Sequence, residues 1–463
     1  MSTGPSASRR EGAGPLYRAS ALDFDVEIAR AGAGYTVTVR SPAGEATSAL
    51  AMPWEGAALA ETLNRVEAAV LQSGPARRSV QSSDHAFAQQ FGTALFGALF
   101  SSEVLALYAA SVEQARQEGA GLRLRMRLRP PELAALPWEL LYEARRREFV
   151  CLSTNTPLVR HVAIPLSLPR LRVDPPLRIL GMCASPRGLA PLDVQREVER
   201  TKTATRALCE RGLIEMKWVE GTTWRHLKDE AQTAQFNVFH FVGHGGFDAA
   251  RDEGFVVLED ESGGGAPLMA SDLALLLVDQ PSLRLVLLNS CDGARGGSRD
   301  LFSAAASILV SRGVPAVIAM QYPVTDQAAV ELSRGLYEAL VTGAPVDAAL
   351  SRARQCVRLA MSGTLEWATP VLHMRSFDGA LFDVRAPSPA PAPSPATVAR
   401  DKTPRHDDVA PAPEPPAPRR EDTRAHAVEG LAEAPPPWEV RLIRGAAVLL
   451  ALASVVLLLA RIF

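Results

Sequence analysis

The residues of this chain best placed for chemistry are a cysteine and a histidine, each of which follows a short apolar run. Leu283 to Gly293 reads LRLVLLNSCDG, so Cys291 stands just after a run of strand length. Asn237 to Gly246 reads NVFHFVGHGG, and there a second apolar run leads to His244. Such runs are typical of buried parallel strands, whose carboxyl ends meet at the sheet edge where α/β proteins bind ligands. We therefore predict that both side chains emerge at one edge, positioned for reaction rather than for packing.

A thiol beside an imidazole has the chemistry of a nucleophile and its base. A free cysteine has a pKa of about 8.5, so a neighbouring histidine is needed to raise its thiolate fraction at neutral pH. His244 would then protonate the leaving group, while the backbone N–H groups of Gly245 and Cys291 would form an oxyanion hole. The alternative for Cys291 is a buried free cysteine, which is a common fate. The histidine at a matching strand end favours the catalytic interpretation.

The other histidine and cysteines considered are interpreted as packing residues. His240 lies four residues before His244 in the same run and is predicted to be a core histidine. No Asp, Glu or Cys stands at zinc-ligand spacing beside it, which argues against a metal site. No nucleotide-binding or calcium loop is evident, so we expect no cofactor. Four further cysteines fall in apolar or helical contexts: Cys151, Cys183, Cys209 and Cys356.

The order of apolar patterns predicts the fold class. From Pro176 onward, strand-like runs such as LRILGMCA, LIEMKWV and PAVIAM alternate with helical patterns. This alternation is typical of βαβ units in a mostly parallel sheet with helices on both faces. Before it, a hairpin pattern from Asp23 and two helical stretches up to Gln117 predict a smaller α+β region. Trp138, within this region, is interpreted as a core anchor.

Charge and composition argue against nucleic acid as a partner. The chain has 49 basic and 51 acidic residues among 463. Residues 121–129 read GLRLRMRLR, which predicts a half-buried strand with a solvated arginine face, because no aromatic residues interleave the arginines. The five cysteines show no metal or disulfide spacing, and no amino-terminal signal peptide is evident, so a reducing cytosol fits best.

The chain contains, in this order, the motifs LPWELLY, HFVGHGGFD, LNSCDGAR, GVPAVIAMQYPVTD and WATPVLHMR. Together they resemble the CHAT domain, a caspase-like cysteine-peptidase family related to separase. The resemblance covers about residues 21–385 and implies a caspase-haemoglobinase fold, a His–Cys dyad and hydrolysis of peptide bonds. By this resemblance His244 is the catalytic base and Cys291 the nucleophile. It also implies a protein or peptide substrate and a role with partner modules in signalling or defence, which leaves an activating partner protein open.

Two residues bear on substrate preference. Asp326 closes QYPVTD, where separase has a similar motif and where caspase-like folds build part of the pocket for the residue before the cut. A carboxylate facing the cleft would favour Arg or Lys there. The alternative is that Asp326 is the N-cap of the helix that follows. Asn289 stands where metacaspases carry an acidic residue, and its neutrality counts against specificity for arginine.

Composition divides the chain into five parts. Residues 1–20 are rich in Ser, Gly and Arg and are expected to be disordered. Residues 21–170 form the N-terminal α+β part, and residues 171–385 form the caspase-like core. Residues 386–440 are dominated by Pro, Ala and charge, which predicts a disordered linker. Residues 441–463 are predicted to be a transmembrane helix.

The last segment is interpreted as a membrane anchor. Residues 445–460 read GAAVLLALASVVLLLA, flanked by Arg441 and Arg444 before and Arg461 after. This run is slightly shorter than the roughly 20 residues that span a bilayer, and the flanking arginines extend its usable length. Arginines before the helix place the bulk of the protein in the cytoplasm. The sequence thus predicts a membrane-tethered cysteine endopeptidase; the alternative is a catalytically latent CHAT scaffold that binds partner proteins at the membrane.

Overall fold

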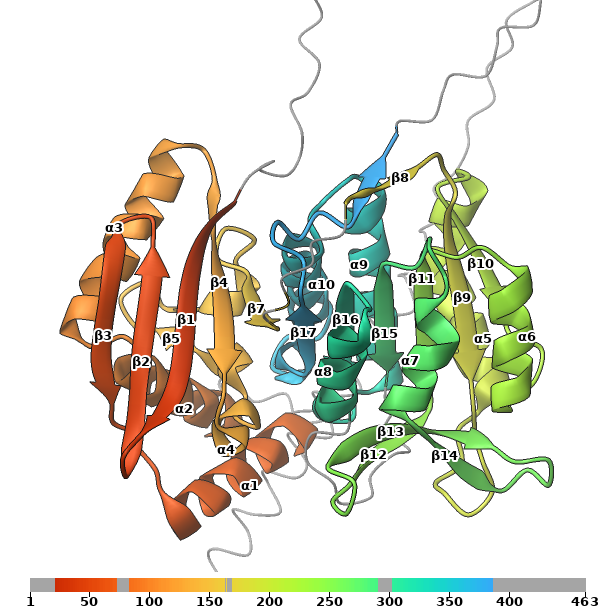
Figure 1. Ribbon diagram of the computed structural model, residues 1–463, viewed down its shortest axis with the longest axis horizontal. Helices are drawn as coiled ribbons and strands as arrows, with labels where there is room; N and C mark the ends of the chain where they lie inside the picture. The colour runs from red at the N-terminus through yellow and green to blue at the C-terminus, as the bar shows by residue number, and fades with distance from the viewer. Residues whose placement is uncertain (1–20, 73–82, 163, 165–168, 290–301, 386–463) are drawn as a thin grey trace, which may run out of the picture. The chain divides into compact units, whose positions relative to one another are not determined.

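The computed structural model describes residues 21–72, 83–162, 164, 169–289 and 302–385, which belong to one compact unit. One sheet of 11 strands runs through them (Figure 1). In spatial order its strands are β10 (Ile214–Trp218), β9 (Leu177–Cys183), β11 (Val238–Val242), β15 (Leu285–Asn289), β16 (Ala316–Met320), β17 (Pro370–Met374), β7 (Leu158–His161), β4 (Gly121–Leu128), β1 (Ala21–Ala31), β2 (Gly34–Ser41) and β3 (Gly44–Leu50).

Most neighbours in this sheet are parallel, as predicted. The strands from β10 to β16 run parallel to one another, and so do β17, β7, β4 and β1. β17 lies antiparallel to β16, which reverses the strand direction at that point. The N-terminal α+β part and the core therefore share one sheet, because β7 pairs with β17.

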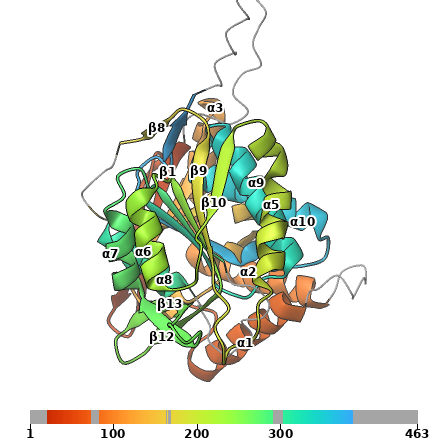
Figure 2. The ribbon, with the colours of Figure 1, turned by 90° about the vertical axis from the view of Figure 1, so that its right-hand side faces the viewer.

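Helices cover both faces of the sheet, which confirms the predicted fold class. Figure 2 shows α5, α9 and α10 on one face and α6, α7 and α8 on the other. The alternating apolar faces of these segments bury against the strands, while their polar faces remain outside. The helices are α1 (Gly56–Gln72), α2 (Ser83–Leu99), α3 (Ser102–Gln117), α4 (Pro131–Ala134), α5 (Val194–Glu210), α6 (Trp224–Thr233), α7 (Ala270–Val278), α8 (Ser303–Arg312), α9 (Asp326–Val341) and α10 (Val346–Ala360).

Smaller sheets and single turns complete the described part of the chain. An antiparallel three-stranded sheet consists of β12 (His244–Asp248), β13 (Glu253–Glu259) and β14 (Gly265–Met269). Two-stranded pairs are β18 (Phe382–Val384) with β8 (Leu171–Val173), and β5 (Tyr142–Glu143) with β6 (Glu148–Phe149). Short 3₁₀ turns are η1 (Trp138–Leu140), η2 (Val150–Leu152) and η4 (Glu366–Ala368).

Arg123 and Arg125 of β4 are buried rather than solvated, so that part of the sequence interpretation was wrong, whereas Arg127 is partly exposed. β1 lies parallel to β4, with Asp23 beside Arg123 and Asp25 beside Arg125. Asp23 accepts hydrogen bonds from Nη1 of Arg123 at 2.9 Å and from Nη1 of Arg125 at 2.8 Å. Each arginine thus has an acidic neighbour in register, which allows both guanidinium groups to be buried.

Trp138 lies in the core of the N-terminal part. Trp138 is fully buried, and its indole N–H donates to the carbonyl of Leu133 at 2.7 Å, which confirms its role as a core anchor.

Among the described residues, no single helix is long and apolar enough to cross a bilayer. α2 and α3 together reach the required length and composition, but they are bent by 100° at the break between them. The predicted anchor at 441–463 lies outside the described residues.

Candidate active site

Three parallel strands end side by side at the edge where the candidate residues were predicted. In β11, Val242 is in register with Cys183 of β9 and with Asn289 of β15. The chain leaves β11 at Val242 and reaches His244 two residues later. Cys291 follows Asn289 by two residues in the sequence and lies outside the described residues. The described strand ends therefore give His244 the place that its sequence context predicted.

The ring of His244 is held in one orientation by a backbone carbonyl. His244 is 7% exposed, and its Nε2 lies 2.9 Å from the carbonyl oxygen of Ala190. Because a carbonyl only accepts hydrogen bonds, Nε2 must carry the proton and donate it. In the neutral ring the other nitrogen, Nδ1, is then the one with a free lone pair. This tautomer provides a base at Nδ1 and a fixed ring plane.

The loop that presents Ala190 is itself anchored. Ser185 follows β9, and its backbone N–H donates to Oε1 of Glu259 on β13 at 3.2 Å. The Oγ of Ser185 accepts a hydrogen bond from the backbone N–H of Leu192 at 2.8 Å, which closes the loop around Ala190. The carboxylate of Glu259 also accepts a hydrogen bond from Thr222 at 2.9 Å. Sequence reasoning missed this support, because the group that contacts His244 is a backbone carbonyl, which every type of residue carries.

The glycines after His244 allow close packing of β12. A Cβ added to Gly245 would clash with the ring of Phe302, and one added to Gly246 would lie 2.6 Å from the ring of Phe255. These positions therefore exclude larger residues for steric reasons. The oxyanion-hole role of Gly245 with Cys291 stays a prediction.

Asn289 ends β15 in a buried position. It is 3% exposed, and its backbone carbonyl accepts a hydrogen bond from Gly243 at 3.2 Å. Its side-chain Oδ1 is buried without a hydrogen-bond partner among the described residues. The backbone of Asn289 thus links the ends of β15 and β11, and its part in substrate recognition stays a prediction.

Asp326 is the first residue of α9 and not its N-cap, which corrects one of the two interpretations. Thr325 is the cap, since its side chain accepts a hydrogen bond from the backbone N–H of Ala328 at 3.3 Å. The carboxylate of Asp326 forms an ion pair with Arg200 of α5. Arg200 also donates to Glu197 at 2.8 Å, so it joins two acidic residues. A basic substrate side chain would have to compete with Arg200 for Asp326.

His240 is a core histidine, as predicted. It is fully buried in β11, and its Nδ1 lies 3.0 Å from the hydroxyl of Tyr337 on α9. Burial lowers the pKa of His240 to about 4, so the ring is neutral at physiological pH. This hydrogen bond connects β11 to α9 rather than to the sheet edge where His244 lies.

The described cysteines divide into buried and accessible residues. Burial raises the pKa of Cys151 to about 11 and that of Cys183 to about 12, which is typical of inert packing residues. Cys209 is exposed on α5, so its interpretation as a packing residue was wrong. Its position on the outer, charged face of that helix explains the exposure, since the apolar stripe there faces the sheet.

A family model places this architecture among known proteins. Residues 89–433 of the 463 match the model of the CHAT domain. The chain belongs to the CHAT domain family. None of the curated proteins searched matches it. The family membership rests on the sequence match and agrees with the motifs LPWELLY, HFVGHGGFD and LNSCDGAR.

Solved structures with partial similarity to this CHAT domain protein include a separase and a cysteine proteinase. Separase from Saccharomyces cerevisiae, in its complex with securin, is 11% identical with a TM-score of 0.42, over 77% of this chain and 30% of that chain. The Arg-specific cysteine proteinase gingipain R is 11% identical with a TM-score of 0.36, over 70% of this chain and 76% of that chain. The similarity thus spans less than a third of the separase chain.

Proposed function

We propose that this CHAT domain protein is a cysteine endopeptidase in which Cys291 is the nucleophile and His244 the general base. The observation that carries the proposal is the orientation of His244 at the end of β11, with Nε2–H bound to the carbonyl of Ala190. This leaves Nδ1 as the proton acceptor at the edge toward which β15, the strand before Cys291, also runs. Family membership and the His-Gly and Ser-Cys motifs support the same assignment.

The reaction follows from these two groups. Nδ1 of His244 takes the proton of the Cys291 thiol, and the thiolate attacks the carbonyl carbon of the peptide bond. The C–N bond then breaks as the imidazolium returns its proton to the leaving amine, which leaves a thioester on Cys291. Water activated by the same imidazole hydrolyses the thioester and regenerates the thiol. The backbone N–H groups of Gly245 and Cys291 would stabilise the oxyanion, and one such donor is worth about 3–4 kcal/mol in other enzymes.

The experiment that tests this proposal is labelling of the full chain with peptidyl electrophiles. The probes carry Arg, Lys, Asp or Leu at the cleavage position and are compared on wild type, Cys291→Ala and His244→Ala. We expect rapid labelling at Cys291 that is lost in both variants. Labelling no faster than at Cys209, which is exposed on α5, would contradict the proposal and favour a latent scaffold that binds partner proteins.

The same probes test substrate preference. The ion pair between Asp326 and Arg200 leaves little reason for strong selection of a basic residue. We therefore expect the Arg and Lys probes to react no more than a few times faster than the Leu probe. In Arg200→Ala, which frees the carboxylate of Asp326, the preference for Arg is expected to rise if Asp326 faces the substrate.

We also propose that residues 441–463 tether the enzyme to a membrane with the catalytic part in the cytoplasm, in a role in bacterial signalling or defence. The support is the apolar run at 445–460 and its flanking arginines. Membrane fractionation of the full chain and of a chain ending at residue 440 tests this. Recovery of both chains in the soluble fraction would exclude the tether. We also propose that a partner protein activates the enzyme.

A further inference from the structure

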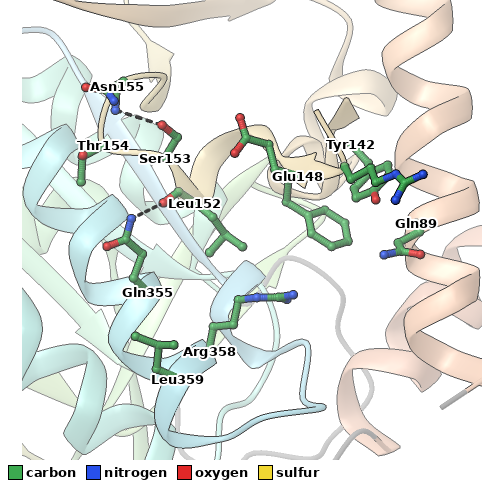
Figure 3. A pocket seen from close by; sticks show the side chains of 12 residues that line it. Gln89, Tyr142, Glu148, Leu152, Ser153, Thr154, Asn155, Gln355, Arg358 and Leu359 are labelled. Carbon is green, nitrogen blue, oxygen red and sulfur yellow. Dashed lines mark hydrogen bonds between the residues drawn. The ribbon is translucent and has the colours of Figure 1, made fainter. Parts of the chain in front are cut away.

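A large groove lies between the β5–β6 hairpin and α10. It has a volume of about 490 Å³, within the range of ligand sites. One wall is the hairpin β5–β6 with Tyr142 and Arg147, and the opposite wall is α10 with Gln355 and Arg358. Figure 3 shows Arg358 extending from α10 toward the hairpin. We call this feature the Arg358 groove.

The walls of the Arg358 groove are fixed by contacts of their own. Gln355 on α10 donates from Nε2 to the carbonyl of Leu152 at 2.7 Å, which ties the helix to the turn before β7 (Figure 3). Beneath them, the rings of Phe149 and Trp367 pack against each other at a tilt of 56°, with centroids 4.7 Å apart. The guanidinium of Arg358 lies over the Trp367 ring, 5.8 Å from its centroid. The groove is therefore a preformed surface with an aromatic floor.

The two arginines of the groove have no acidic partner within the described ranges. Arg358 is half-buried and makes no ion pair there, and burial lowers its pKa. Arg147 at the rim is exposed and also makes no ion pair with a described residue, because Glu143 and Glu148 lie within 3.6 and 3.7 Å of Arg146 instead. The carboxylate of Glu148 is turned away from Arg358 in Figure 3. Guanidinium groups without an acidic partner, such as those of Arg358 and Arg147, can pair with an anionic ligand.

Two further features of the groove indicate the chemistry of that ligand. Leu359, next to Arg358 on α10, is 81% exposed, so a large apolar side chain stands uncovered beside the charge. Arg147 has a φ of 55°, in the left-handed region that favours glycine. This conformation is that of the last residue in the four-residue turn between β5 and β6, at the exposed rim of the groove. An apolar contact beside two guanidinium groups suits a polypeptide segment that carries acidic and apolar side chains together.

Strand directions place this groove at the same edge of the sheet as His244. β7 runs antiparallel to β11, since the direction reverses between β16 and β17. The turn before β7, which lines the groove, therefore lies at the edge where β11 ends. Four strand steps separate β11 from β7, which amounts to about 19 Å at the usual spacing. An extended chain spans this with roughly six residues.

We propose that the Arg358 groove is a docking site for an acidic and apolar segment of the polypeptide substrate, at least about six residues from the bond that is cut. This inference rests on the proposed peptidase function. The acidic side chains pair with Arg358 and Arg147, and an apolar side chain packs on Leu359. One substrate molecule then contacts both the groove and the catalytic edge.

Direct binding tests the docking site without requiring catalysis. A fluorescein-labelled peptide of alternating Glu and Leu is titrated against the full chain carrying Cys291→Ala, with fluorescence anisotropy as the readout. We expect binding that weakens at least tenfold in Arg358→Glu and in Arg147→Glu, the latter being an exposed position. Arg206→Glu, an exposed charge reversal on α5, is the matched control and should bind as the parent does.

Control peptides and a cleavage assay give the outcomes that overturn the inference. Equal binding of peptides with Gln or Lys in place of Glu would overturn it, as would equal affinity in the charge-reversal variants or no binding to the parent at millimolar peptide. In the active chain, a substrate that carries the Glu-Leu segment is expected to show a KM at least tenfold lower than one without it, with kcat unchanged. Binding without any cleavage or labelling would refute the peptidase proposal and leave the groove as a peptide site.

Discussion

Arg123 joins the N-terminal strands to the core through a buried ion pair, and its loss is expected to destabilise the protein strongly. Its Nε donates to Asp347 at the start of α10 at 2.5 Å, and its Nη1 donates to Asp23 at 2.9 Å. The guanidinium also donates to the carbonyls of Phe377 at 3.0 Å and Asp378 at 2.7 Å. The side chains of Arg123 and Asp347 are only 2% and 1% exposed. Water therefore cannot replace these bonds when the arginine is removed.

Arg123→Met is the informative change, since methionine fills most of the space but carries no charge. It leaves the carboxylate of Asp347 buried without its partner, and removing one member of a buried pair typically costs about 3–5 kcal/mol. Against a total stability of about 5–15 kcal/mol for a folded domain, this is a large fraction. Urea unfolding of the full chain, followed by circular dichroism, measures the difference in the free energy of unfolding.

Two further variants separate the ion pair from a general effect of substitution. Asp347→Asn added to Arg123→Met removes the unpaired charge, so the double variant is expected to be about 1–3 kcal/mol more stable than the sum of the single changes predicts. Arg170→Met breaks an exposed pair with Asp378 and should cost no more than about 1 kcal/mol. If Arg123→Met costs no more than Arg170→Met, or if the two changes are strictly additive, the reasoning is refuted.

Three other changes have definite expected outcomes in the same unfolding assay. Gly245→Ala places a methyl group against the ring of Phe302 and should cost about 1–3 kcal/mol; an unchanged urea midpoint would contradict this packing. Arg284 and Arg375 are buried near each other without an ion pair among the described residues, and burial and Arg375 lower the pKa of Arg284. Arg375→Met should therefore leave the free energy of unfolding equal or higher. A loss above about 1 kcal/mol would contradict this reasoning. Burial lowers the pKa of His240 from 6.5 to about 4, so the stability that its neutral ring contributes is complete above pH 6.5 and is lost as the pH falls toward 4. His240→Gln should therefore reduce the loss of stability between pH 7 and pH 4.5. An identical loss in this variant and in the wild type would refute this.

Local patterns in the sequence were sufficient for the strands and for the place of His244. β11 and β15 were predicted because uninterrupted apolar runs of strand length have few other uses in an α/β protein. His244 lies at the edge of the sheet because the apolar run before it, which forms β11, ends at Val242. The cap of α9 was misplaced by one residue, although Thr325 stands directly before Asp326 and is an equally good cap by type.

Contacts between distant segments were beyond sequence reasoning. Arg200 pairs with Asp326 across α5 and α9, and neither helix pattern indicates the other. The buried arginines of β4 illustrate the same limit. The alternating acids of DFDVE and the alternating arginines of GLRLR were both visible, but only the parallel register of β1 and β4 sets Asp23 beside Arg123. The carbonyl of Ala190 that orients His244 has no side-chain signature at all.

The reversal of direction at β17 determines which loops can act together. In a fully parallel sheet, the turn before a strand lies at the edge opposite to the loop that follows its neighbour. Because β17 and β7 run against β16, the turn before β7 lies at the edge of the sheet where β11 and β15 end. Had β17 been parallel to β16, Gln355 and the turn it binds would face away from His244. The antiparallel step thus allows the Arg358 groove and the candidate catalytic residue to act on one extended polypeptide.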